Sequence, residues 1–314
     1  MATAPGKLIL TGEYAVLDGA SALVVAVDRR AVARMRGLAP VGSSPFLLSV
    51  AHEIAARRGA GDPAAKAALE ISVDSSAFYD GAQKLGLGSS AAVTVAATAL
   101  ALSHADGAGH PDEVFAIASA AHAAAQGARG ARGSGADIAA ATYGGVIRFS
   151  GGKPFPAKQW PRGLRLVSFF TGESADTATL VARVMAARAE RPAAVNAALT
   201  AIADASTAAI GAVFAGHPSG IIGGLALAAA AIDRLALATG IPLVPDCVIA
   251  ARSALKAFGG TAKTTGAGGG DVAIAVVPET EDPGAVHRTL VACGCQPLSL
   301  SVDDGGVDLR SPAS

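Results

Sequence analysis

The chain has 314 residues, enough for one large domain or two of medium size with well-filled cores. Lysine and arginine together number 25, as do aspartate and glutamate, so there is no basic excess for a nucleic-acid backbone. Hydrophobic residues make up 51% and aromatic residues only 4%, so the stacking platforms of single-strand binders are missing. The composition argues against nucleic-acid binding and predicts cores built from small side chains.

The N-terminus and the cysteines predict a soluble, cytoplasmic protein. The opening residues, MATAPGKLILTGEY, contain one lysine and too short an apolar run for a signal peptide. The longest uncharged stretch, residues 208–232, contains a histidine, a proline and several glycines, which predicts a loop between helices and no membrane span. The three clustered cysteines, Cys247, Cys293 and Cys295, are too few for a disulfide framework and fit buried, reduced thiols.

Short β-rich runs open the chain, and Asp18-Gly19 between two of them predicts a hairpin. The elements expected next are a helix, a strand, two helices and a strand, over residues 44–58, 69–73, 93–103, 112–126 and 146–149. Asp112 and Glu113 in the first turn of the second of these two helices, and Gly127 behind its end, fit the dipole and C-cap preferences of a helix.

A Gly/Pro-rich stretch, residues 151–163, is the best candidate for a domain boundary, and it divides the chain into 1–155 and 156–314. The elements expected beyond it are a strand, an Ala-rich helical region and a second strand, over residues 164–170, 175–238 and 271–277. Strands at both ends of each half, with helices between them, predict an α+β fold and not regularly alternating α/β units.

The stretch KLGLGSSAAV, which begins at Lys84, allows three interpretations. Gly86-x-Gly88-x-x-Ala91, with Asp106 about 20 residues further on, satisfies a dinucleotide-binding fingerprint. That fingerprint needs a hydrophobic strand directly before the first glycine, whereas residues 79–84 are polar and turn-like. The glycines and serines also suit a phosphate cradle at a helix N-terminus, or simply a capped turn.

A second candidate site lies in residues 127–145, where Arg129 and Arg132 stand among glycines ahead of Ser134 and Asp137. Ser134 and Asp137 have the spacing of a capping box, which favours a structural role for the pair. Arginine clusters bind phosphate or carboxylate, and an adjacent aspartate can accept or steer a proton. Both interpretations stay open at this point.

The third candidate is KTTGAGGGD, residues 263–271. Its glycine run predicts either a mobile hairpin loop before a buried strand or a close backbone approach to a ligand. Lys7 near the N-terminus has a similar pair of interpretations. It is either a solvated surface group or a positive charge that lowers the pKa of an aspartate or neutralises a transferring phosphate.

Together, PGKLILTGEYAVLDG, GLGSSAA and TTGAGGGD occur in the order typical of the GHMP small-molecule kinases, named for galactokinase, homoserine kinase, mevalonate kinase and phosphomevalonate kinase. The chain resembles this superfamily over most of its length and is most similar to the phosphomevalonate kinases. Gln126 ahead of GSGAD (133–137), and FTGESADTATLV (170–181), carry the closer likeness, although Phe170 and Asp176 stand where the family has tryptophan and serine. The resemblance implies a two-domain α+β fold with the active site in the cleft between the domains.

The resemblance implies transfer of a phosphoryl group from ATP to (R)-5-phosphomevalonate, with Mg²⁺, in the mevalonate pathway. The residues that would hold the ATP phosphates are Gly86, Gly88, Ser89, Ser90 and Ala91, with Ser90 and Gln126 as ligands of Mg²⁺. Asp137 would orient or deprotonate the acceptor, and Lys7 would neutralise charge beside it. The residues implied for substrate binding are Glu13, Tyr14, Lys84, Arg132, Ser134, Thr171, Thr264 and Gly266, with Arg129 and Arg148 as lesser candidates.

Other functions remain possible on the sequence alone. The nearest is mevalonate kinase or another GHMP kinase acting on a small hydroxy acid. A different class is an NAD-dependent oxidoreductase, which requires a strand before Gly86. A third is a catalytically silent binding protein of the kinase fold, against which Lys7, Ser90 and Asp137 occurring together argue. We expect small-molecule partners, no membrane or nucleic acid, and a monomer or homodimer.

Overall fold

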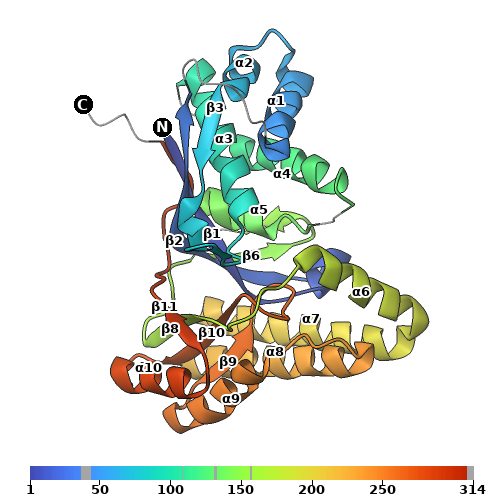
Figure 1. The fold of residues 1–314 in the computed structure, drawn as a ribbon, viewed down its shortest axis with the longest axis vertical. Helices are drawn as coiled ribbons and strands as arrows, with labels where there is room; N and C mark the ends of the chain where they lie inside the picture. Colours follow the sequence, from blue (N-terminus) through green and yellow to red (C-terminus); the bar gives the residue numbers. More distant parts are fainter. Residues whose placement is uncertain (37–43, 108, 131–132, 156–157, 310–314) are drawn as a thin grey trace.

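The structure is a computed structural model, and it describes residues 1–36, 44–107, 109–130, 133–155 and 158–309. Figure 1 shows two stacked parts. The upper part contains the first sheet with α1–α5, and the lower part contains a second sheet with α6–α10. Among the residues described, every strand pairing is antiparallel, which agrees with the predicted α+β class.

The first sheet is built on a long hairpin of β1 (Ala2–Thr11) and β2 (Ala22–Met35). The predicted hairpin is confirmed, and its connection includes a 3-10 turn, Ala15–Asp18, which ends at Gly19 with φ +91°. The sheet order is β12-β1-β2-β6-β7, with β3 also pairing with β2. The bounds of these strands are Ile71–Asp74 (β3), Val146–Ser150 (β6), Lys153–Pro154 (β7) and Asp308–Leu309 (β12).

The helices of the upper part surround α3, whose small side chains allow close packing from several sides. Most of α3 is buried, and it packs on β1 and β2 as well as on the helices around it. The helices are α1 (Pro45–Arg58), α2 (Pro63–Leu69), α3 (Ser89–Asp106), α4 (Pro111–Gly127) and α5 (Ala136–Tyr143). The three helices predicted in this region are confirmed, as is the helical run expected with Ser134 and Asp137, which is α5, whereas α2 was not predicted. Gly127 is the last residue of α4, not the residue after it.

The second sheet has the order β11-β8-β10-β9. Its strands are β8 (Leu164–Phe170), β9 (Thr261–Thr264), β10 (Val272–Pro278) and β11 (Gln296–Leu298). The helices of this part are α6 (Thr177–Glu190), α7 (Pro192–Ala215), α8 (Pro218–Thr239), α9 (Asp246–Ala254) and α10 (Pro283–Ala292). The two strands and the helical region predicted for this half are confirmed. A two-stranded hairpin, β4 (Tyr79–Asp80) with β5 (Gln83–Lys84), and two further 3-10 turns, Ser76–Phe78 and Leu255–Phe258, complete the elements.

Helices α7 and α8 correct the interpretation of residues 208–232 as a loop. The left-handed Gly216 (φ +65°) ends α7, and Pro218 begins α8, so only Gly216 and His217 connect the two helices. Both helices are long and apolar enough to cross a membrane by length and composition, which is weak evidence. They pack along each other, and a Cβ on Gly224 would lie 2.7 Å from the Cα of Ala209. This contact is typical of a paired core helix.

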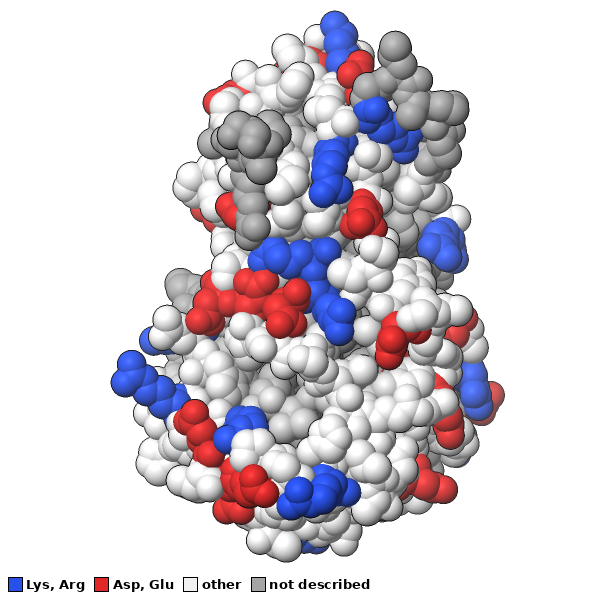
Figure 2. All heavy atoms as spheres, turned by 60° about the vertical axis from the view of Figure 1, so that its left-hand side comes forward, with Lys and Arg blue, Asp and Glu red and all other residues white. Residues whose placement is uncertain are grey.

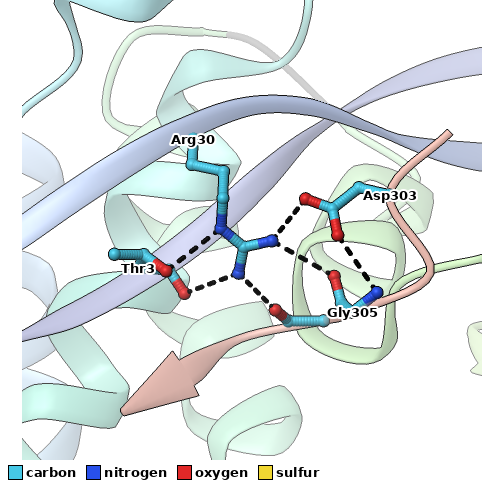
Figure 3. Close-up of polar contacts among 5 residues, drawn as sticks. Thr3, Arg30, Asp303 and Gly305 are labelled. Atoms are coloured by element: carbon cyan, nitrogen blue, oxygen red, sulfur yellow. Dashed lines mark hydrogen bonds and ion pairs between the residues drawn. The ribbon is translucent and has the colours of Figure 1, made fainter. Parts of the chain in front are cut away.

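The end of the chain returns to the first sheet, where β12 pairs with β1. Arg30 holds this segment (Figure 3): its guanidinium forms an ion pair with Asp303 and donates to Gly306 O at 2.6 Å and to Thr3 Oγ1 at 3.0 Å. The upper part therefore includes residues from beyond β11. The division into 1–155 and 156–314 stays a prediction. Strand β12 falls in the second of these ranges, although it belongs to the sheet formed by the first.

Charged side chains of both signs lie next to one another on the narrow waist where the two parts meet, on the face that Figure 2 shows. Elsewhere on that face, basic and acidic residues are interspersed. This distribution agrees with equal numbers of basic and acidic residues in the sequence.

Candidate active site

The phosphate-loop candidate runs from Leu85 to Gly88 and leads directly into α3. Gly88 is the N-cap of the helix in the left-handed conformation (φ +77°), and no side chain caps it. The backbone N–H groups of the first turn of α3 are therefore available to an anion, which the helix dipole also favours. The loop is tied to β1 because the Lys7 N–H donates to Leu87 O at 2.9 Å.

This geometry decides between the interpretations of the loop. The residues before Gly86 form β5, a two-residue strand paired antiparallel with β4, and no long strand runs into the first glycine. A dinucleotide-binding fold needs a parallel strand there, so the oxidoreductase hypothesis is wrong. The capped-turn interpretation also fails, since Gly88 has no side-chain cap.

Lys7 lies beside the loop, where a Cβ on Gly88 would come within 3.0 Å of Lys7 Cε. Burial lowers the pKa of Lys7 below that of an ordinary lysine, and the positive charge of Lys84 adds a smaller lowering effect. The carboxylates of Asp137, Asp271 and Glu13 oppose this shift in the Lys7 pKa, in that order of strength. Lys7 is thus a partly buried cation among carboxylates that come from both parts of the molecule.

Asp137 lies in the first turn of α5, which begins after the left-handed Gly135. The predicted capping box is not formed. Ser134 Oγ accepts a hydrogen bond from the Ala136 N–H at 3.3 Å, and Asp137 Oδ1 accepts one from the Ile138 N–H at 3.0 Å. The structural role that the spacing suggested for Ser134 and Asp137 is therefore absent, and Asp137 acts on the charge state of Lys7.

Ser90, in the first turn of α3, contacts α4. Its Oγ lies 3.1 Å from Nε2 of His122, and Nε2 of Gln126 lies 3.5 Å from the same ring nitrogen. Gln126 Oε1 is buried and has no hydrogen-bond partner among the described residues, and a Cβ on Gly133 would collide with it. Sequence reasoning missed His122, because a histidine one helical turn before Gln126 belongs to none of the motifs.

The residues near Ser90 fit a magnesium ion. A serine hydroxyl and an amide carbonyl are hard oxygen donors, which Mg²⁺ prefers, and in the part of the chain that the structure describes nothing else pairs with Gln126 Oε1. Among the residues described there is no group of three or more His, Cys, Asp or Glu side chains that could hold a metal. Few protein ligands suffice for Mg²⁺ at a nucleotide, since the ion usually keeps waters and binds phosphate oxygens.

Asp271 brings a carboxylate from the lower part to the phosphate loop, and it was also missed. It has φ +55° at the end of the glycine run, and a Cβ on Gly86 would lie 2.6 Å from its Oδ2. Burial raises the pKa of Asp271, and this rise is opposed by the hydrogen bond from the Ala175 N–H and by the charges of Lys84 and Lys7. The clue in the sequence was an aspartate directly after three consecutive glycines.

Two predicted substrate residues contact the segment around the second glycine run. Glu13 forms an ion pair with Lys263, and each side chain is 1% exposed. Lys263 Nζ also donates to Thr264 O at 2.6 Å, and the Tyr14 hydroxyl donates to Ala267 O at 2.6 Å. Glu13 and Tyr14 therefore fasten the end of β1 to the lower part, and their role in substrate binding stays a prediction.

The remaining predicted residues are placed as follows. Lys84 is exposed on β5, and Arg148 stacks over the Phe155 ring at 4.5 Å. Thr171 is buried and donates to Asp271 O through both its N–H (3.0 Å) and its Oγ1 (3.1 Å). Gly266 has φ +64°, and Arg132 lies outside the described residues.

Asp176, which departs from the family pattern, has a clear structural role. It is the N-cap of α6 and accepts hydrogen bonds from the Ala178 and Thr179 N–H groups at 3.0 and 3.3 Å. These bonds, together with that from the Thr179 hydroxyl, lower the pKa of Asp176, and Arg129 adds a minor effect. The aspartate therefore serves as well as a serine would in starting this helix.

Comparison with known proteins identifies the class of enzyme. The family model for the GHMP kinases N terminal domain matches residues 45–145. The phosphomevalonate kinase of Streptomyces sp. (strain CL190) is 30% identical over an alignment of 362 residues. The alignment covers 95% of this chain and 96% of that relative. The protein is a phosphotransferase. It belongs to the GHMP kinase family.

Solved structures show the same fold at lower identity. The Lin0012 protein from Listeria innocua superposes with a TM-score of 0.81 at 22% identity, and the match covers 99% of both chains. Streptococcus pneumoniae phosphomevalonate kinase in complex with phosphomevalonate and AMPPNP superposes with a TM-score of 0.76 at 19% identity, over 96% of this chain and 99% of that one. The predicted GHMP kinase fold is thereby confirmed.

Proposed function

We propose that the protein transfers the terminal phosphoryl group of ATP to (R)-5-phosphomevalonate, which gives ADP and 5-diphosphomevalonate. The observation that carries the proposal is the position of Lys7 beside Gly88 at the start of α3, where the charges of Asp137 and Lys84 both act on the Lys7 pKa. The likeness to a phosphomevalonate kinase along almost the whole chain supports this choice of substrate.

The nucleotide would bind where α3 begins. The N–H groups of Ser89, Ser90 and Ala91 lie in the first turn of the helix and suit the phosphates of ATP. Ser90 Oγ and Gln126 Oε1 would hold Mg²⁺, which supplies charge neutralisation between the phosphates when bound. Lys7, close to Gly88, adds a fixed positive charge at the same place.

The acceptor differs from an alcohol in one important respect. A phosphate monoester has a second pKa of about 6, so its oxygen is already anionic near pH 7 and needs little help from a general base. The main obstacle is the approach of two anions, which the positive charges of Lys7 and Lys84 reduce. Asp137 would then orient the acceptor and keep Lys7 protonated, since its carboxylate raises the Lys7 pKa.

The cofactors, partners and location of the enzyme are inferred together with its reaction. We infer ATP with Mg²⁺ as the cofactors, small molecules as the partners and a soluble protein in the cytoplasm. The mutual packing of α7 and α8, with buried residues such as Ile202 and Leu235, supports core helices and not membrane spans. A monomer and a homodimer both remain compatible with this proposal.

An ADP-release assay with three acceptors tests the proposal. The full chain is given ATP and Mg²⁺ with mevalonate, 5-phosphomevalonate or 5-diphosphomevalonate, and we expect turnover with 5-phosphomevalonate only. The Asp137→Asn variant is the matched negative control. Turnover with mevalonate alone would make the protein a mevalonate kinase, and binding of ATP without turnover on any acceptor would indicate a silent member of the family.

A further inference from the structure

His122 is a buried histidine that the proposed chemistry does not use. It is 2% exposed, lies on α4, and stacks on the ring of Phe46 with centroids 5.2 Å apart. Its Nε2 points to the first turn of α3, where Ser90 Oγ lies 3.1 Å away. A polar ring nitrogen kept out of water is costly unless it is paired, and the contact with Ser90 Oγ provides that partner.

Both neighbours of His122 Nε2 have a group that can donate to it. The side-chain amide nitrogen of Gln126 lies 3.5 Å from Nε2, and an amide nitrogen can only donate. In the tautomer of His122 that carries its ring proton on Nδ1, Nε2 has one lone pair, and the Ser90 hydroxyl, the nearer of the two groups, can donate its proton to that nitrogen. A serine hydroxyl has one proton and two lone pairs. With the proton directed at His122, both lone pairs of Ser90 Oγ are left for a cation.

We propose that His122 is a positioning residue that orients the Ser90 hydroxyl for binding of the Mg²⁺–nucleotide complex. The inference rests on the proposed function, because it takes Ser90 as a ligand of Mg²⁺. Groups that orient a metal ligand by a hydrogen bond commonly have large effects on metal affinity, although they never touch the metal. Gln126 also contacts His122 Nε2, so the imidazole ring of His122 lies between the two proposed Mg²⁺ ligands, Ser90 and Gln126.

The test measures how much Mg²⁺ strengthens binding of a non-hydrolysable ATP analogue. Calorimetry gives the dissociation constant with excess Mg²⁺ and with EDTA, and the ratio of the two is the Mg²⁺ enhancement. The variants are His122→Phe, which keeps a ring against Phe46 but removes the acceptor, and His122→Gln, whose carbonyl can replace it. Ser90→Ala and the double variant Ser90→Ala/His122→Phe complete a double-mutant cycle. His122→Leu replaces His122→Phe if thermal unfolding shows that the latter is misfolded.

We expect His122→Phe to reduce the Mg²⁺ enhancement about tenfold. The affinity without Mg²⁺ should change less than about twofold, and His122→Gln should keep most of the enhancement. In the Ser90→Ala background, His122→Phe should have no further effect, because the hydroxyl that it orients is gone.

Three results would overturn the inference. They are an unchanged enhancement in His122→Phe, an equal loss of affinity with and without Mg²⁺, and additive effects in the double variant. An equal loss would mean that His122 only supports the loop. If the wild-type protein itself shows no Mg²⁺ enhancement, the proposed function fails first, and the two failures are thereby distinguished.

Discussion

The two glycine-rich loops look alike in the sequence but differ in what their glycines contact. In the first loop, Gly88 leaves room for the side chain of Lys7, whose Cε would be 3.0 Å from an added Cβ. In the second loop, the space beside Gly268 is filled by the backbone carbonyl of Leu243, and that beside Gly270 by Glu173 O. The glycines of the first loop approach side chains, whereas Gly268 and Gly270 of the second loop approach backbone.

A glycine-rich loop can therefore allow a close approach either by a side chain or by another stretch of backbone. The second run permits tight packing that fixes Asp271 at the start of β10, from where its carboxylate reaches Gly86. The sequence allows either a mobile loop or a ligand contact; Gly268 and Gly270 are packed against backbone, whereas Gly266 has open space beside it, and its contact with a ligand stays a prediction. The carboxylate of Asp271, at the end of the second loop, therefore lies against Gly86 in the first loop.

The partly buried Lys7 and the fully buried Lys263 differ in the same way, and the largest effects are expected for these two lysines. Lys7→Met should lower kcat at least about 100-fold with little change in stability, because it removes a positioned charge from the reacting phosphates. Lys263→Met should instead destabilise the fold by about 3–5 kcal/mol, because Glu13 would be left as an uncompensated buried charge. Steady-state kinetics and urea unfolding of both variants measure the two effects. A stable Lys263→Met protein with lost activity would contradict this assignment.

Alanine substitutions in the two loops give the next largest contrast. Gly268→Ala should cost at least about 2 kcal/mol of stability, since the left-handed backbone (φ +73°) and the Leu243 carbonyl both oppose a Cβ. Gly88→Ala has the same left-handed backbone cost (φ +77°) but meets the flexible Lys7 side chain and no backbone atom, so it should lose less stability than Gly268→Ala and show a roughly tenfold fall in kcat through displacement of that side chain. Thermal unfolding with activity per folded molecule separates the two. Equal stability losses with equal activity would remove the distinction between the loops.

The smallest effect concerns pH. Because burial lowers the pKa of Lys7, kcat/KM should fall on the alkaline side at a pH below the ordinary lysine value of 10.5, as Lys7 loses its proton. The negative charge of Asp271 raises that pKa, so Asp271→Asn should move the alkaline limb to lower pH. The exposed Asp246, changed to Asn, is the control and should leave the limb in place. A shift to higher pH in Asp271→Asn would show that the two side chains do not interact as described.

The parts of the site that depend on local backbone geometry could be predicted from the sequence. Gly88 before a helix and Asp137 after a Gly-Ser-Gly turn stand at sharp turns, and such turns need particular residues in a fixed order. The hairpin at Asp18-Gly19 and the strand over 164–170 follow from the same local rules.

Contacts between distant segments could not be predicted. Glu13 and Lys263 are 250 residues apart, and neither residue type indicates a buried pair. His122 stands on a helix face whose neighbour depends on how α3 and α4 pack. Residues 208–232 were misread because two residues suffice to join α7 and α8, so a short turn within an apolar stretch looked like a longer loop.

The most direct test of the central claim is to identify the bond that the enzyme forms. Phosphorus-31 NMR of the product from 5-phosphomevalonate, ATP and Mg²⁺ distinguishes a phosphate acceptor from an alcohol acceptor. Phosphoryl transfer to the substrate phosphate predicts a diphosphate with two mutually coupled phosphorus signals, in step with the ADP released. A new, uncoupled monoester signal would mean that a hydroxyl is the acceptor, and either that result or an unchanged substrate would contradict the account.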